Sequence, residues 1–151
     1  MKKAKELNLT VKGTRLLTVA ELNEFEDVLN DPSMAWWLAD EDPNDSDRNA
    51  YAEGNYTDED MYCGKGEPNT FIRVALDLES ASDAGLKNGD EFVFKGYVFT
   101  VLSDTLAISN NFLGCGAICT EEWDVIVFGQ DPGLVPNVKE IIATLFENYE
   151  E

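Results

Sequence analysis

A pair of tryptophans followed at once by a run of acid constrains this chain more than any other feature of its sequence. Residues 34–47 read Met-Ala-Trp-Trp-Leu-Ala-Asp-Glu-Asp-Pro-Asn-Asp-Ser-Asp, with no basic residue before Arg48. Two indoles and a leucine are typical of a hydrophobic core, whereas the carboxylates after them cannot be buried without partners. The sequence therefore predicts that the chain passes here from interior to surface, and that this surface is strongly negative.

The aromatic residues around this run have two interpretations. Trp36 and Trp37 are expected to pack in the core, and the alternative is an exposed platform for a ligand. Tyr51, Tyr56 and Tyr62 follow in a polar, turn-rich stretch, where they either pack on a sheet edge with wet hydroxyls or form a binding surface.

The charge balance is the outlier of the composition. Thirty acids against eleven bases give a net charge of −19 over 151 residues. A chain this acidic repels DNA, RNA and anionic membranes, so it is expected to bind neither nucleic acid nor membrane directly, and its expected partners are cations, basic proteins or basic grooves. By segment the net charge is 0 for residues 1–30, −9 for 31–70, −3 for 71–110 and −7 for 111–151.

Targeting signals and cysteine usage predict a cytoplasmic protein. No apolar run approaches the roughly 18 residues of a membrane-spanning helix, and no apolar segment follows the basic N-terminus as in a signal peptide. The cysteines are odd in number, which argues against a disulfide scaffold. They are expected to be small buried thiols, with a zinc site completed by Asp as the alternative: Cys63, Cys115 and Cys119.

The absence of histidine excludes several kinds of chemistry. Ser-His-Asp and Cys-His nucleophiles, His acid–base catalysis near neutral pH and His-containing zinc sites all require that residue. Carboxylate pairs are common by chance in so acidic a chain. We therefore expect no catalytic residues, no metal site and no enzyme activity.

One stretch partly matches a calcium loop. Residues 42–53 carry oxygen ligands at the first, third and fifth positions and Glu53 at the twelfth. Asp47 stands where such a loop has glycine, and no flanking helices are predicted. A looser calcium site in the 40–53 loop and a solvated acidic loop remain the two alternatives, and no other cofactor is expected.

Local patterns predict the elements of the fold. Thr18 and Glu21 form a capping box at the start of a helix over 19–29. Residues 1–15 are basic, and either form a strand-like arm on the acidic body or a solvated, frayed tail. The remaining expectations are a strand over 14–18, loops and short strands over 40–68, a strand over 69–78 whose Arg73 pairs with acid, a hairpin over 90–102 turning at Lys95-Gly96, strands over 105–109 and 123–128, a turn over 130–133 and a final helix over 138–149.

Three of these stretches together resemble a known family. Leu-Leu-Thr-Val-Ala-Glu at 16–21, Trp-Trp-Leu at 36–38 and Ile-Arg-Val-Ala-Leu at 72–76 resemble the LLS-x-x-E, WWLRSP and GVRPAL motifs of a family of domains of unknown function in phages and gut Firmicutes. Residues 89–102 are similar to the GDxVxFGxYxWxVL hairpin of its longer members, with the two parts in swapped order. Ala39, Asp40 and Val74 stand where the family has Arg, Ser and Pro.

The resemblance implies a fold and a setting. It implies an α+β chain with a C-type-lectin-like, or sulfatase-modifying-factor-like, mixed α/β unit, followed by a β-hairpin or meander and a terminal helix. The expected division is a lectin-like part over 1–78, a linker over 79–85 and a hairpin unit over 86–151, packed as one domain. The setting is a phage or prophage.

Two hypotheses for function follow. In the first, the protein is a phage-encoded nucleic-acid mimic of the anti-CRISPR or anti-restriction type, which blocks the basic groove of a host nucleic-acid-handling protein in the host cytoplasm. In the second, it is a lectin-like module that binds a ligand or the host surface. The partner-binding residues expected under the first are the carboxylates after the Trp pair: Asp40, Glu41, Asp42, Asp45, Asp47, Glu53, Asp58, Glu59 and Asp60.

Overall fold

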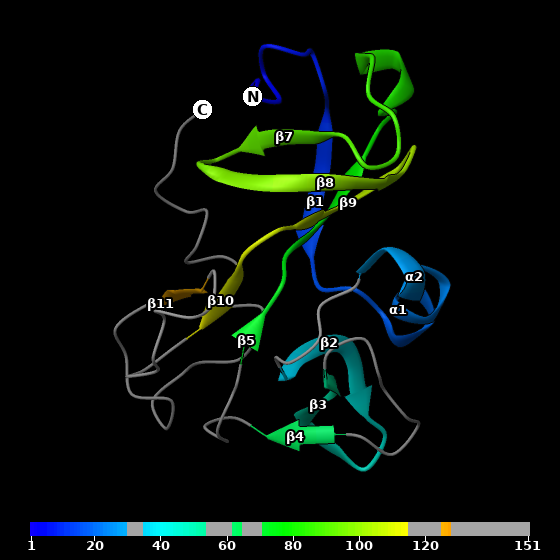
Figure 1. Cartoon of the computed structure of the whole chain (residues 1–151). Helices are drawn as coiled ribbons and strands as arrows, with labels where there is room; N and C mark the ends of the chain where they lie inside the picture. The colour runs from blue at the N-terminus through cyan, green and yellow to red at the C-terminus, as the bar shows by residue number, and fades with distance from the viewer. Residues whose placement is uncertain (30–34, 54–61, 65–70, 115–124, 128–151) are drawn as a thin grey trace. The chain divides into compact units, whose positions relative to one another are not determined.

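The chain folds into two strand-rich units, each built around its own sheet. The computed structural model describes residues 1–29, 35–53, 62–64, 71–114 and 125–127 (Figure 1). Within these residues the architecture is mixed α and β with mainly antiparallel strands, which confirms the predicted class at a coarse level. The turn expected over 130–133 and the helix expected over 138–149 lie outside the described residues.

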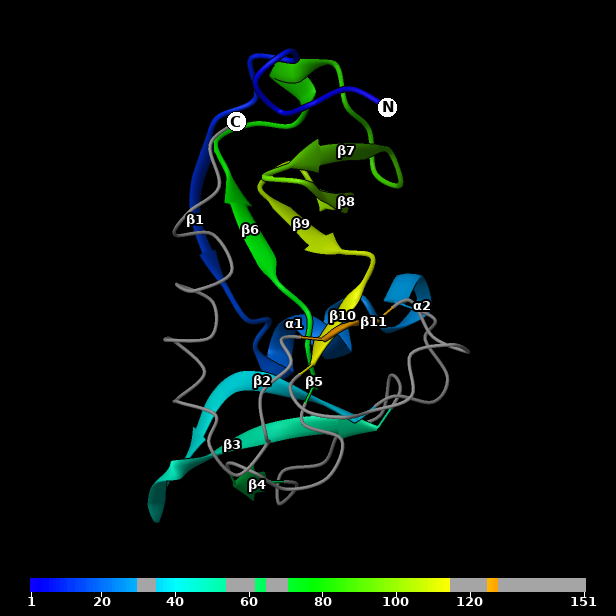
Figure 2. The same cartoon turned by 90° about the vertical axis from the view of Figure 1, so that its left-hand side faces the viewer.

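Unit 1 consists, within the described residues, of 1–15 and 74–111. Its five strands form one antiparallel sheet in the order β1-β6-β9-β8-β7, and Figure 2 shows β1, β6 and β9 side by side. The elements are β1 (Val11–Arg15), β6 (Ala75–Leu78), the short 3₁₀ helix η1 (Ser82–Ala84), β7 (Glu91–Phe94), β8 (Tyr97–Ser103) and β9 (Leu106–Ser109).

The β7–β8 hairpin confirms the predicted Lys-Gly turn. Lys95 and Gly96 both have positive φ, 49° and 84°, as a two-residue turn matched to the twist of a hairpin requires. Behind the turn, Phe92 pairs across the strands with Phe99, and their rings stack with centroids 5.9 Å apart. Both rings are fully buried, so this pair is the centre of the unit 1 core.

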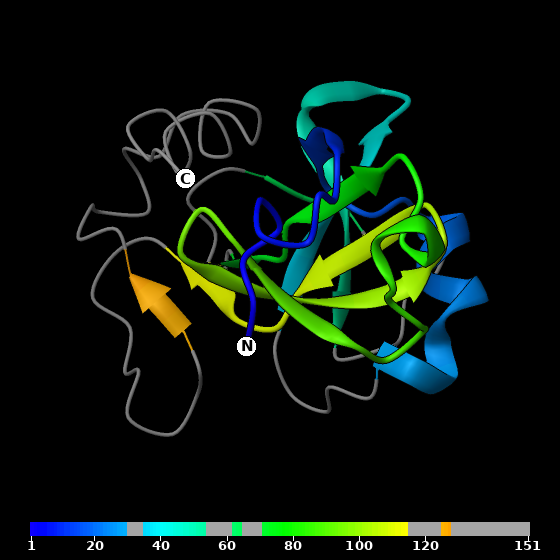
Figure 3. The same ribbon diagram turned by 90° about the horizontal axis from the view of Figure 1, so that it is seen from above.

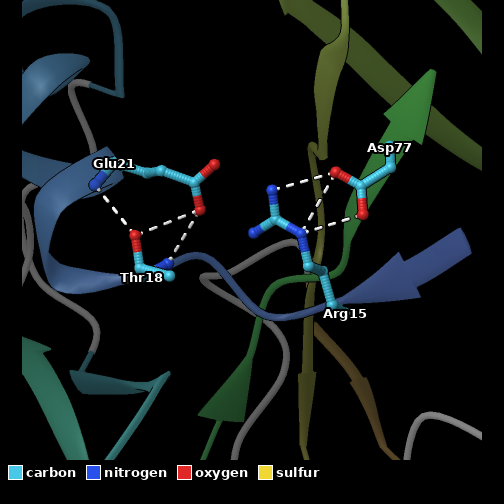
Figure 4. Close-up of polar contacts among 4 residues, drawn as sticks. All are labelled: Arg15, Thr18, Glu21 and Asp77. Carbon is cyan, nitrogen blue, oxygen red and sulfur yellow. Dashed lines mark hydrogen bonds and ion pairs between the residues drawn. The ribbon is translucent and has the colours of Figure 1, made fainter. Parts of the chain in front are cut away.

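Residues 1–15 pair with the strands at both edges of this sheet. They therefore form a strand-like arm and not a solvated, frayed tail. Strand β1 pairs with β6 at one edge, three residues earlier than the strand expected over 14–18. At the other edge Lys3 bridges to Val93 of β7. The Arg15 guanidinium binds the Asp77 carboxylate of β6, with Nε 3.0 Å from Oδ2 (Figure 4).

The expected linker over 79–85 is an ordered part of unit 1. Ala81 is buried, and the Asp104 carboxylate accepts the Ser82 N–H at 2.8 Å and the Ser80 hydroxyl at 3.2 Å. The observed division therefore differs from the expected boundaries at 78 and 86. The reason is strand pairing, because β6 lies between β1 and β9, which come from opposite sides of those boundaries.

Unit 2 consists of the described residues within 16–73 and 112–138. Its six-stranded sheet has the order β11-β10-β5-β2-β3-β4, with parallel pairing only for β10–β11 and β2–β5 among the described strands. The strands are β2 (Ala35–Asp42), β3 (Asp45–Glu53), β4 (Tyr62–Gly64), β5 (Phe71–Ile72), β10 (Phe112–Gly114) and β11 (Val125–Val127).

The helix expected over 19–29 is broken into two. α1 (Val19–Glu24) ends at Phe25, and α2 (Glu26–Leu29) follows. The capping box is confirmed, because the Glu21 N–H donates to Thr18 Oγ1 and the Thr18 N–H donates to Glu21 Oε1, both at 3.1 Å (Figure 4). Val28 is 57% exposed, since the break at Phe25 (φ −106°, ψ 20°) interrupts the helical periodicity.

The strand expected over 69–78 is divided between the two sheets. β5 belongs to the sheet of unit 2 and β6 to that of unit 1, with Arg73 and Val74 between them. All residues over 72–76 are buried. A continuous apolar run shows that a strand is buried but not which sheet it joins.

Candidate functional site

The acidic run is the end of a β-hairpin, at the start of the stretch 40–68 over which the sequence predicts loops and short strands. Strand β2 continues to Asp42, and β3 begins at Asp45, its partner in the register. The Asn44 N–H donates to Asp42 Oδ1 at 2.9 Å and closes an Asx turn around Pro43. Pro and Asn favour this turn, which lets the polar residues on either side pair. We call residues 40–53 the acidic hairpin.

The root of the hairpin is core. Trp36 and Trp37 are 1% and 2% exposed, so the core prediction is confirmed and neither ring forms an exposed platform. The sequence predicts that Arg73 pairs with an acid. In the structure the Arg73 guanidinium lies over the Trp36 ring, 5.5 Å from the ring centroid. A buried cation–π contact of this kind stabilises by about 2 kcal/mol when desolvated.

A bulge in β2 separates the buried root from the acidic end. Trp37 pairs with Tyr51 and Glu41 with Asn49, so three residues of β2, 38–40, face one residue of β3. The Asn49 side-chain amide donates to the Leu38 carbonyl at 3.0 Å. A bulge bends a strand and leaves backbone groups without ladder partners, so these groups are available to another segment.

That segment is the start of α1. The Ala39 N–H donates to the Leu17 carbonyl at 2.7 Å, and Asp40 Oδ2 accepts the N–H of Val19, the first residue of α1, also at 2.7 Å. A carboxylate on the first turn of a helix satisfies a free N–H and complements the helix dipole. Asp40, predicted to contact a partner, therefore has a structural role as a second cap on α1.

The remaining residues of the predicted partner-binding set differ in their exposure and in the element that carries them. Glu41 is exposed, and Asp42 is half-buried. Asp45, Asp47 and Glu53 lie on β3, where Asp45 is directly opposite Asp42. Like charges directly opposite each other destabilise a strand pair. The last three residues of the predicted set lie outside the described residues: Asp58, Glu59 and Asp60.

The partial match to a calcium loop lies in a β-hairpin. Residues 42–53 form a tight turn and strand β3, between β2 and β4. Among the described side chains, no group of three or more Cys, Asp and Glu could hold a metal ion. A looser calcium site over 40–53 remains a prediction, because the side chains of Asp45, Asp47 and Glu53 are not described. Two of the three cysteines, Cys115 and Cys119, lie outside the described residues.

Acidic residues are distributed unequally between the two units. The net charges of consecutive sequence segments do not show this. The two described stretches of unit 1, residues 1–15 and 74–111, carry seven Lys and Arg and seven Asp and Glu, a net charge of zero. Residues 16–73, the longer stretch of unit 2, carry three bases and fifteen acids, a net charge of −12. The signal is present in the sequence, but it becomes visible only when the discontinuous unit 1 is known.

Comparisons with known proteins identify no family for this chain. No family model matches the sequence, and neither curated proteins nor solved structures give a significant match. The resemblance to the phage domain family therefore stays a prediction. Over the part of the chain that the structure describes, no helix has the length and apolar character needed to cross a membrane.

Proposed function

We propose that this chain is an acidic, non-enzymatic binding protein that blocks the basic nucleic-acid-binding groove of a host defence protein. The observation that carries the proposal is the separation of charge, with −12 over residues 16–73 and zero over the two described stretches of unit 1. A surface this negative competes with phosphates for Arg and Lys clusters, and does so less well as salt is raised. In this proposal the setting is a phage or prophage, and the protein acts in the host cytoplasm.

The acidic hairpin supplies the contact surface in this proposal. Asp45 and Asp47 lie on β3, the second strand of this hairpin. Glu41 is exposed on β2, and Asp40 is left out of the contact set because it caps α1.

The test is capture of a partner from host lysate with two matched variants. The first neutralises three carboxylates of the acidic hairpin, by Glu41→Gln, Asp45→Asn and Asp47→Asn. The control neutralises three exposed carboxylates of unit 1, by Glu6→Gln, Glu79→Gln and Asp83→Asn, and changes the net charge by the same amount. Thermal melts of both variants confirm that the fold is retained.

The expected result is capture of one basic nucleic-acid-handling protein by the wild type and by the control, with loss in high salt. The hairpin variant should capture it at least about tenfold less well, since each charged contact is worth about 0.5–1 kcal/mol or more. Equal loss in both variants would assign binding to net charge alone. No capture of such a protein would reject the proposal.

A second proposal rests on the resemblance, which implies a C-type-lectin-like fold and a module that binds a ligand or the host surface. The mixed α and β class is compatible with it, and the finer fold belongs to this proposal. Binding of the wild type to immobilised glycans, measured with calcium and with a chelator, tests it. Sugar binding that depends on calcium would favour the lectin-like module over the nucleic-acid mimic.

A further inference from the structure

Strand β7 is the last strand of its sheet, and residues 1–9 cover its outer edge. The Val93 N–H donates to the Lys2 carbonyl at 2.9 Å, and the Ala4 N–H donates to the Val93 carbonyl at 2.7 Å. Figures 1 and 3 show this N-terminal segment, in blue, beside the β7–β8 hairpin. We call residues 1–9 the strap.

Few contacts attach the strap to unit 1. Two of its side chains are buried, Ala4 at 1% and Leu9 at 7% exposure, whereas Lys2, Lys3 and Lys5 are exposed. The Leu9 N–H donates to the Ala4 carbonyl at 3.0 Å, so part of the strap's bonding is internal. Detachment therefore removes from unit 1 two bonds to β7, the buried Ala4 and Leu9 side chains and the half-buried Leu7.

The sheet itself does not depend on these bonds. Both backbone groups of Val93 point to the strap, so the ladder between β7 and β8 runs through the neighbouring pairs, Phe92–Phe99 and Phe94–Tyr97. Without the strap, β7 would remain in the sheet with the donor and acceptor of Val93 exposed.

An exposed edge with the sequence Glu-Phe-Val-Phe is a template for pairing with another chain. Two copies of one strand pair antiparallel about a two-fold axis, which is a self-complementary arrangement. The two described stretches of unit 1 that form this sheet have no net charge, so repulsion between them near this edge is weak. We propose that the strap is a releasable guard, and that β7 pairs with β7 of a second copy of this chain when the strap leaves.

The first test is Ala4→Glu in the full chain. A charge cannot be accommodated at a position that is 1% exposed, so the strap is displaced. We expect a dimer by analytical ultracentrifugation at concentrations where the wild type is monomeric. Added salt should strengthen the dimer, because each copy carries −19, whereas salt weakens binding to a basic groove. The control is Asn8→Asp, which adds the same charge at an exposed strap position and stays monomeric.

A second substitution locates the interface. Val93→Pro removes the edge N–H without removing a bond of the β7–β8 ladder. The double variant Ala4→Glu/Val93→Pro should therefore be monomeric. A dimer that persists in the double variant, or a folded Ala4→Glu variant that is monomeric at every concentration, overturns the proposal.

Hydrogen exchange of the wild type tests the release itself, including the case in which Ala4→Glu fails to fold. Release of the strap exposes the Val93 amide while the Phe92 amide stays in the ladder. We expect Val93 to exchange at least about tenfold faster than Phe92. Equal protection of the two amides would mean that the strap leaves only on unfolding of the sheet, which contradicts a releasable guard.

Discussion

The two units differ in how far bases balance their carboxylates. In unit 1 acids have donors within the unit: Asp77 binds Arg15, Asp104 accepts from Ser80 and Ser82, and Asp90 accepts the Lys87 N–H at 2.8 Å. In the acidic hairpin Asp40 and Asp42 also accept backbone N–H groups, but residues 16–73 hold only three bases against fifteen acids. The described stretches of unit 1 are therefore balanced in charge, whereas residues 16–73 carry an excess of acid, as expected of a surface that serves binding.

The largest expected effect is in the uncharged core of unit 1. Phe99→Ala removes a fully buried ring that stacks on Phe92 and meets the edge of Phe94. The free energy of unfolding of unit 1 should fall by about 3–5 kcal/mol, because a buried phenyl ring leaves a cavity. Hydrogen exchange of β8 and β9 under denaturant measures it. Val28→Ala, at a position 57% exposed, is the control and should change stability little.

The next largest effect on stability distinguishes Asp40, which caps α1, from its neighbour Glu41. Asp40→Ala should destabilise unit 2 by about 1 kcal/mol, because the N–H of Val19 loses its acceptor. Glu41→Ala removes the same charge from an exposed position and should be neutral or slightly stabilising. Urea titration followed by Trp fluorescence, which reports Trp36 and Trp37 together with Trp123, compares the two. Equal effects would show that Asp40 acts through charge and not as a cap.

A smaller effect should appear on adding salt. Screening should stabilise the hairpin by about 0.2–1 kcal/mol for each like-charged cross-strand pair, such as Asp42 and Asp45. Unit 1, whose stretches have no net charge, should change less. Hydrogen exchange of the β2–β3 and β8–β9 peptides at low and high ionic strength gives both responses in one experiment. An equal response in the two regions would contradict the contrast between the units.

The smallest effect is a pH dependence within unit 1. The Ser82 N–H, with hydroxyl donors from Ser82 and Ser80, holds the pKa of Asp104 below its ordinary value. Folding therefore favours the carboxylate, and its stabilisation is present above about pH 3.9, the ordinary value, and is lost as pH falls through the lower folded pKa. Asp104→Asn should be slightly less stable than the wild type at pH 7, with the difference shrinking below about pH 4. Asp83→Asn, at an exposed neighbouring position, is the control for denaturant titrations at each pH.

Features that depend on a few neighbouring residues were predictable. The capping box of Thr18 and Glu21, the turn at Lys95 and Gly96 and the burial of the Trp pair are all confirmed. Each depends on hydrogen bonds, positive φ or apolar surface within a short stretch. The strongly negative character of the chain also follows from composition alone.

Features that depend on distant partners were not predictable. Arg15 meets Asp77 across 62 positions of sequence, and Asp40 caps a helix that starts 21 residues earlier. The apolar run over 71–78 carries no mark of the point at which it leaves one sheet for the other. Strand pairing between remote segments brought residues 1–15 and 74–111, whose charges balance, into one sheet, and left the acid-rich residues 16–73 in the other unit.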